Sequence, residues 1–156
     1  MANPRLAPYG RAAHQTIEAM GISLQLKDKI VFGENVSQTL QFARSGNAEY
    51  AFIAQSQYLA LGSGSSWLVP QTMYDPVEQH AVQLSQSSIA SLFMQFLDSE
   101  TARDIIVKHG YGLPNGQRGR LASGVVESGT CCRDNVCLVV AWNASCLVVG
   151  KNSMAV

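Results

Sequence analysis

Two short segments, each next to the start of a predicted helix, contain the residues best placed to do chemistry. Ala7-Pro8-Tyr9-Gly10 precedes the first helix, and Glu34-Asn35-Val36 opens the second. The start of a helix presents unsatisfied backbone N–H groups and about half a positive charge. Two such starts that converge on one point form an anion site that needs no lysine or arginine. Ordinary capped helices of an α/β protein carry the same patterns, and the residues alone favour that interpretation.

Other motifs indicate no catalytic or metal site. The turn Gly62-Ser63-Gly64 lacks the glycine and lysine spacing of nucleotide-binding loops, and no Gly-x-Ser-x-Gly nucleophile elbow occurs. Neither the histidines nor the cysteines have zinc-ligand spacing. These residues are His14, His80, His109, Cys131, Cys132, Cys137 and Cys146. We expect structural or surface roles for the histidines, and the role of the cysteines stays open.

The composition is that of a globular protein. Hydrophobic residues make up 47% of the chain and charged residues 14%, with a formal net charge of zero. Such a balance argues against a nucleic-acid or anionic-membrane binder, which normally carries a basic excess. The first residues lack the basic and apolar regions of a signal peptide, and the longest apolar run, residues 137–142, is too short to span a bilayer.

Helical and strand-like segments alternate over residues 1–113, which predicts an α/β fold with a mainly parallel sheet flanked by helices. The expected helices are residues 11–20, a segment that opens at Asn35 and ends at Gly46, residues 89–97 and residues 100–109, with a short helix or loop at 56–61. The expected strands are residues 29–32, 50–54, 67–69 and 80–84.

Residues 114–156 differ from the rest of the chain. They carry four basic and two acidic side chains, whereas residues 1–113 carry seven basic and nine acidic ones, and they contain all four cysteines. We therefore place a boundary near Pro114, between a domain of residues 1–113 and an irregular tail. The apolar patches 137–142 and 146–149 are expected to pair as a hairpin. Because turn residues are frequent, the tail is expected to add little to the stability of the domain.

The order and wording of many short motifs in residues 2–113 resemble one family. The motifs are Asn3-Pro4, Ala7-Pro8-Tyr9-Gly10-Arg11-Ala12-Ala13, Gly33-Glu34-Asn35-Val36, Leu40-Gln41-Phe42, Ser45-Gly46-Asn47-Ala48-Glu49, Ala51-Phe52-Ile53-Ala54-Gln55-Ser56-Gln57, Val69-Pro70, Tyr74-Asp75-Pro76-Val77, Gln79-His80-Ala81-Val82, Phe93, Phe96-Leu97, Ser99, Ala102 and His109-Gly110-Tyr111-Gly112. Together they are similar to the second half of the molybdate-binding substrate-binding proteins of ABC transporters.

The resemblance implies one lobe of a type II periplasmic-binding-protein fold. In that family two lobes close on a tetrahedral oxyanion, molybdate or tungstate, held by main-chain N–H groups and a few hydroxyls. On this chain the donors would be the backbone N–H groups of Tyr9 and Val36. Some members place a tyrosine hydroxyl at the position of Ala54, and nearby Ser56 is the substitute hydroxyl here. No cofactor and no directly bound metal ion is implied.

The resemblance also implies a periplasmic protein that works with an ABC permease. Without a signal peptide, the chain as given would stay in the cytoplasm. Since the first lobe of the family has no counterpart here, we expect weak molybdate binding unless that lobe acts in trans or a self-dimer replaces it. The alternative is a truncated remnant or interaction domain that binds no anion. An enzyme is the least favoured interpretation, because no nucleophile–base pair emerges.

Overall fold

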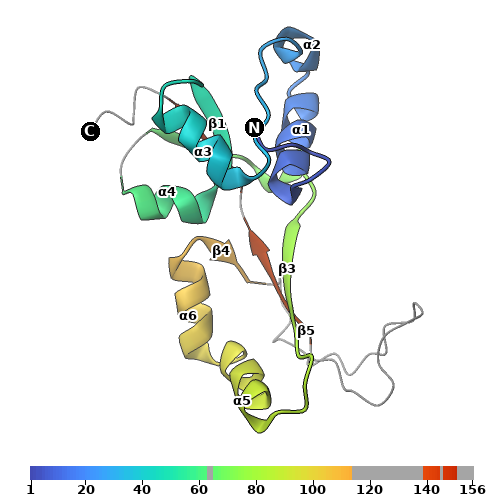
Figure 1. Cartoon of the computed structure of the whole chain (residues 1–156), viewed down its shortest axis with the longest axis vertical. Coiled ribbons are helices and arrows are strands. Elements are labelled where there is room, and N and C mark those ends of the chain that lie inside the picture. The colour runs from blue at the N-terminus through green and yellow to red at the C-terminus, as the bar shows by residue number, and fades with distance from the viewer. Residues whose placement is uncertain (63–64, 114–138, 145, 151–156) are drawn as a thin grey trace, which may run out of the picture. The chain divides into compact units, whose positions relative to one another are not determined.

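The structure is a computed structural model that describes residues 1–62, 65–113, 139–144 and 146–150 (Figure 1). The chain divides into two compact units, Met1–Val77 with Ala144–Val156, and Glu78–Asn143. This division differs from the expected boundary near residue 113, because it separates residues 78–113 from the first unit and includes the last described strand in that unit. None of the described helices has the length and apolar character needed to cross a membrane.

The first unit combines helices with a three-stranded sheet in the order β1-β6-β2. Its helical elements are α1 (Pro8–Ala19), α2 (Ser23–Leu26), α3 (Val36–Arg44), α4 (Gln55–Leu61) and the 3-10 turn η1 (Gln71–Met73). Its strands are β1 (Tyr50–Ala54), β2 (Ser66–Leu68) and β6 (Cys146–Gly150). The expected helices near residues 11–20 and 36–45 and the strand at 50–54 are confirmed. Residues 29–32, expected as a strand, belong to no named element.

The core of the first unit lies on both faces of β1. Ala51 and Ile53 pack against Ala43 of α3, whereas the intervening Phe52 packs against Ala13 and Ile17 of α1. Successive side chains of a strand point to opposite faces, so this alternation lets one apolar strand bury both of its sides. A helix therefore covers each face of β1.

The direction of strand pairing corrects the expected mainly parallel sheet. Both described ladders of the first unit, β1 with β6 and β2 with β6, are antiparallel. The one parallel pairing described is an isolated bridge between Ala2 and Gly33. The apolar pattern of residues 50–54 correctly indicated a buried strand. It carried no information about direction, because a strand buried on both faces looks the same whichever way its neighbour runs.

The second unit combines two helices with another three-stranded sheet. Its elements are β3 (Val77–Val82), α5 (Ser88–Leu97), α6 (Glu100–Lys108), β4 (Tyr111–Gly112) and β5 (Val139–Ala144), with the sheet order β3-β5-β4. The predicted helices at 89–97 and 100–109 are confirmed. The predicted hairpin of the tail is wrong, because its two strands belong to different sheets: β5 lies between β3 and β4, and β6 lies between β1 and β2.

Candidate functional site

Two helices of the first unit, α1 and α3, are preceded by segments that run side by side. Ala2 and Gly33 form the parallel bridge, the Asn3 N–H donates to the Gly33 carbonyl (2.7 Å), and the Gly33 N–H donates to the Met1 carbonyl (3.0 Å). The first segment continues into α1 and the second into α3. Since parallel segments end at the same edge, the starts of α1 and α3 lie at that edge, the usual place of ligands in α/β folds.

The start of α1 is held by its own loop. The Asn3 carbonyl accepts hydrogen bonds from the N–H groups of Leu6 (3.0 Å) and Ala7 (2.9 Å), and Pro8 occupies the first turn, where its fixed φ suits a helix. Gly10 lies so close to the bridged segment that an added Cβ would be 2.4 Å from the Ala2 carbonyl oxygen. This close approach requires glycine, and it ties the turn that contains Tyr9 to the parallel segments.

The start of α3 is capped by a side chain. Asn35 Oδ1 accepts from the Gln38 N–H (2.9 Å), and Gln38 Oε1 accepts from the Glu34 N–H (2.7 Å). Asn35 is therefore the N-cap, as predicted. The cap uses the third N–H of the helix, and no described residue accepts a hydrogen bond from the N–H of Val36, the first residue of the helix. That group remains a donor for a ligand at the helix start.

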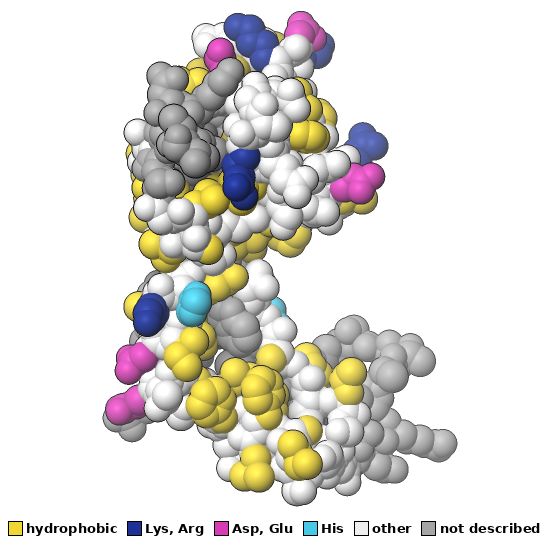
Figure 2. Space-filling view, turned by 60° about the vertical axis from the view of Figure 1, so that its left-hand side comes forward, with side chains coloured by type: hydrophobic (Ala, Val, Ile, Leu, Met, Phe, Trp, Pro, Cys, Tyr) yellow, Lys and Arg dark blue, Asp and Glu magenta, His cyan; other side chains and the backbone are white. Residues whose placement is uncertain are grey.

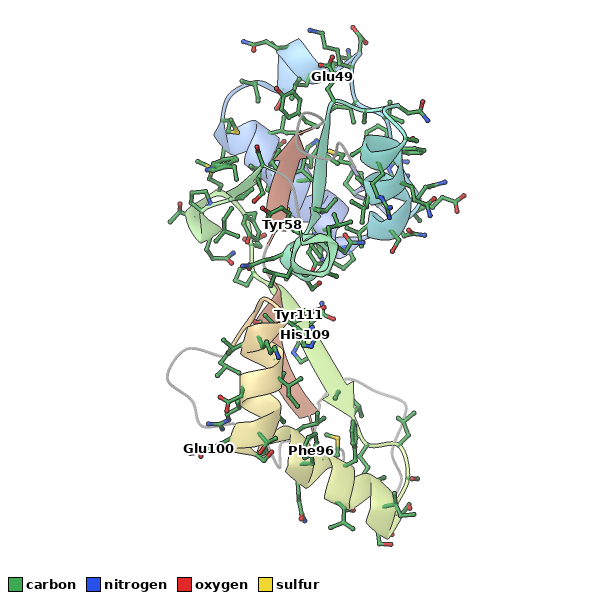
Figure 3. The ribbon with its side chains drawn as sticks, turned by 90° about the vertical axis from the view of Figure 1, so that its left-hand side faces the viewer. Glu49, Tyr58, Phe96, Glu100, His109 and Tyr111 are labelled. Carbon is green, nitrogen blue, oxygen red and sulfur yellow. The ribbon has the colours of Figure 1, made fainter. Side chains whose placement is uncertain are left out.

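A third helix start joins the same edge. The Gln57 side chain spans two helices: its Oε1 accepts from the Ala54 N–H at 3.2 Å, and its Nε2 lies 3.5 Å from Ser37 Oγ in the first turn of α3. Ser56, the predicted substitute hydroxyl, is half-buried in the first turn of α4. Tyr58 (Figure 3) packs from the same helix against the cluster of Ala43, Ala51 and Ile53.

Sequence reasoning missed Ser37 and Gln57. Their signal was present: a hydroxyl stands directly after Val36, and a glutamine stands three residues after Ala54, the spacing at which a side chain reaches back to the N-cap amide. The three predicted residues, Tyr9, Val36 and Ser56, all lie in first turns of helices of one unit. The bridge and the Gln57 contact connect those turns.

The polar groups of the candidate site are backbone amides, side-chain amides and hydroxyls. Among the described residues, no group of three or more His, Cys, Asp or Glu could hold a metal ion. His14 and His80 pair with the exposed carboxylates of Glu18 (3.3 Å) and Glu78 (3.6 Å). Donors of this kind suit an anion that accepts hydrogen bonds on several oxygens.

One cysteine is described, and it lies opposite Ala54, the residue that precedes α4. Cys146 is fully buried in β6 and forms no disulfide within the part of the chain that the structure describes. The other three, Cys131, Cys132 and Cys137, fall outside the described residues.

Comparison with known proteins assigns the family. The bacterial extracellular solute-binding protein family matches residues 1–112. The molybdate-binding protein ModA of Rhodobacter capsulatus is 40% identical over 114 residues, which cover 71% of this chain and 45% of the relative. ModA of Azotobacter vinelandii is 39% identical over 119 residues, which cover 72% of this chain and 47% of the relative. No solved structure matches the chain significantly.

The chain thus spans somewhat less than half the length of the curated relatives that it matches. The matched residues include every helix of the site described above and both helices of the second unit. The family is a class of binding proteins and not a class of enzymes. A match over more than two thirds of the sequence shows that the chain belongs to the bacterial extracellular solute-binding protein family.

Proposed function

We propose that the first unit is one lobe of a molybdate-binding protein and that it binds the oxyanion at the joined starts of α1 and α3. The observation that carries the proposal is the parallel bridge between Ala2 and Gly33, which brings the two turns to one edge. Two relatives named as molybdate-binding share 39–40% of their aligned residues with this chain. The ligand donors are the backbone N–H groups of Tyr9 and Val36, and the hydroxyl of Ser56 is a further donor.

The physical basis is the hydrogen bonding that a dianion requires. A molybdate ion taken from water needs most of its oxygen lone pairs satisfied again, because unpaired buried charge is costly. Backbone N–H groups at helix starts supply donors and partial positive charge without a full cation. Tungstate has the same tetrahedral shape and charge, so the proposed site does not distinguish the two anions by its donors.

The donors of one lobe cover one side of the anion. Two hydrogen bonds to a charged acceptor, each worth about 1.5–3 kcal/mol, correspond to a dissociation constant between about 40 μM and about 6 mM. Tight binding therefore needs a second set of donors, from a complementary lobe supplied in trans or from a second copy of this chain. In the transport setting that we infer, the complete two-lobed protein is of the type II class, works in the periplasm and delivers the anion to an ABC permease.

The test uses the backbone donor at Val36. Proline at this position removes the N–H but suits the first residue of a helix, and the extended backbone of Asn35 (φ −146°, ψ 174°) is the conformation that precedes proline. In a titration of the full chain with sodium molybdate, followed by ¹⁵N–¹H NMR, we expect the amide signals of Tyr9 and Val36 to shift. Val36→Pro should weaken binding about tenfold or more.

Val36→Ala is the matched control, because it shortens the side chain and keeps the N–H. It should bind molybdate as the unmodified chain does. Equal binding by the Pro and Ala variants would remove Val36 from the site. Absence of any shift at millimolar molybdate, also with a complementary lobe added, would favour an interaction domain that binds no anion.

A further inference from the structure

The end of the chain supplies the middle strand of both sheets. β6 lies between β1 and β2, and β5 lies between β3 and β4. The family match ends at residue 112, so both middle strands come from outside the matched residues, whereas the flanking strands β1 to β4 lie inside them. An extension beyond the family match has no general reason to occupy the centre of a sheet. Its position therefore calls for a physical explanation.

The pairing of β6 is extensive. All five residues of β1 have a register partner in β6, and all three residues of β2 have one as well. Val148 lies between Phe52 of β1 and Trp67 of β2. Without β6, the facing edges of β1 and β2 would carry unpaired backbone N–H and C=O groups, which a protein must pair or cover.

Cys146, the first residue of β6, is hydrogen-bonded to the first unit through its backbone. Its N–H donates to the Tyr74 hydroxyl (3.1 Å), and its carbonyl accepts from the Val69 N–H (3.3 Å). The Cys146 side chain is 0% exposed, and its register partner Ala54 is buried as well. Both backbone groups of Cys146 and its side chain are thus accommodated by the first unit, as expected for a fitted segment and not for a loosely attached one.

We propose that the strands β5 and β6 act as built-in complementing segments and that β6 fills a strand slot between β1 and β2. The strand slot is defined by the facing edges of Tyr50–Ala54 and Ser66–Leu68. It recognises an extended apolar segment that runs antiparallel to both strands and pairs with them through the main chain, as in β-strand addition. The occupant is the chain's own Cys146–Gly150. This proposal is independent of anion binding.

The first experiment tests occupancy in the full chain by disulfide formation. Directly opposed residues of antiparallel strands have Cα atoms about 4.5–5.5 Å apart, which is within the range of a disulfide. Ala54→Cys, in a chain with Cys131, Cys132 and Cys137 changed to serine, should form an intramolecular disulfide with Cys146. Mass spectrometry of the unreduced digest detects it.

Ala51→Cys in the same background is the matched control. Ala51 is also buried in β1, but its partner is Val149, so Cys146 lies about 10 Å away along the strand, beyond disulfide reach. A disulfide in both variants or in neither would overturn the proposal. A disulfide found only between two chains would show that a second copy fills the strand slot, and it would overturn the assignment to the same chain.

The second experiment tests recognition. Val148→Pro removes an N–H from the middle of a central strand, a position that excludes proline. A labelled peptide with the sequence of residues 144–150 should bind the Val148→Pro chain and restore its strand signal in circular dichroism. It should bind the unmodified chain at least about tenfold more weakly, because the strand slot is already occupied there.

A peptide that carries the same proline is the control and should bind neither chain. Equal binding of the first peptide to both chains, or a Val148→Pro chain that keeps the original fold without peptide, would overturn the proposal. A Val148→Pro chain that the peptide neither binds nor refolds would contradict recognition by the strand slot. The disulfide experiment stays decisive for occupancy whether or not this variant folds.

Discussion

The two units use similar amphipathic helices with different results. In the first unit, α3 buries Thr39 and Ala43 and packs on β1, whose Ile53 is fully buried. In the second unit, α5 has Met94 as its buried residue, whereas Ile89 is 77% exposed and Phe93 57% exposed. Hydrophobic side chains of α5 and α6 therefore remain exposed. The space-filling view in Figure 2 colours the hydrophobic side chains of one face of the molecule yellow.

The difference shows that an amphipathic pattern predicts an apolar helix face but does not predict which element covers that face. The spacing of Ile89, Leu92, Phe93 and Phe96 (the last labelled in Figure 3) is that of an apolar stripe. The apolar stripe of α3 is no stronger, yet α3 packs against the strand β1. The first unit is therefore expected to hold the stability of the described chain, and the second unit to open more easily.

The largest effect should come from equivalent truncations in the two units. Ile53→Ala removes fully buried atoms and should lower the free energy of unfolding by about 2–5 kcal/mol. Ile89→Ala alters an exposed side chain and should change it by less than about 0.5 kcal/mol. Urea unfolding followed by circular dichroism measures both. Similar losses in the two variants would show that the units are equally packed.

A second comparison uses tyrosines. Burial raises the pKa of Tyr74 above its ordinary value, outweighing the lowering effect of the hydrogen bond from Cys146. The folded state therefore holds the hydroxyl proton of Tyr74 more tightly than the unfolded state does. The resulting contribution to the free energy of unfolding is fully present below the unfolded pKa near 10, and it is lost as the pH rises through the pKa of the folded state. We expect the free energy of unfolding to fall steadily above about pH 10.

Tyr74→Phe should remove this part of the decline. At neutral pH it should also cost about 1–3 kcal/mol, because the hydrogen bond from the Cys146 N–H to the Tyr74 hydroxyl is removed. Tyr111→Phe, in β4 of the second unit, is the control and should keep the alkaline decline. Urea unfolding at a series of pH values distinguishes them. An unchanged alkaline decline in Tyr74→Phe would contradict the assignment.

The smallest effect should come from the two helix caps. Asn35 caps α3, and Ser99 caps α6, where its Oγ accepts from the Ala102 N–H at 3.2 Å. Replacing either by alanine should cost about 1 kcal/mol of local helix stability. In amide hydrogen exchange, Asn35→Ala should lower the protection of amides throughout the first unit. Ser99→Ala should lower the protection of amides in α5 and α6 alone. The same spread in both variants would mean that the units unfold together.

Much of the local structure was predictable from the sequence, because its signals lie within a few residues. Asn35 and Pro8 mark the starts of α3 and α1, and the apolar run of residues 50–54 indicates a buried strand. The motifs that resemble molybdate-binding proteins led to the family that the comparisons confirm. Tyr9 and Val36 were found next to helix starts by these local rules, and Ser56 was named from the resemblance as the hydroxyl near Ala54. Their role as ligand donors stays a prediction.

The pairing of distant segments was decided by the tertiary structure alone. The bridge from Ala2 to Gly33 joins residues 31 positions apart, and Ala54 faces Cys146 across more than ninety positions of sequence. Caps and periodicity are local, whereas the partner and direction of a strand depend on which apolar edges remain uncovered once the helices have packed. For that physical reason the sequence predicted the helices and β1, but not the antiparallel pairing or the position of β6 between β1 and β2.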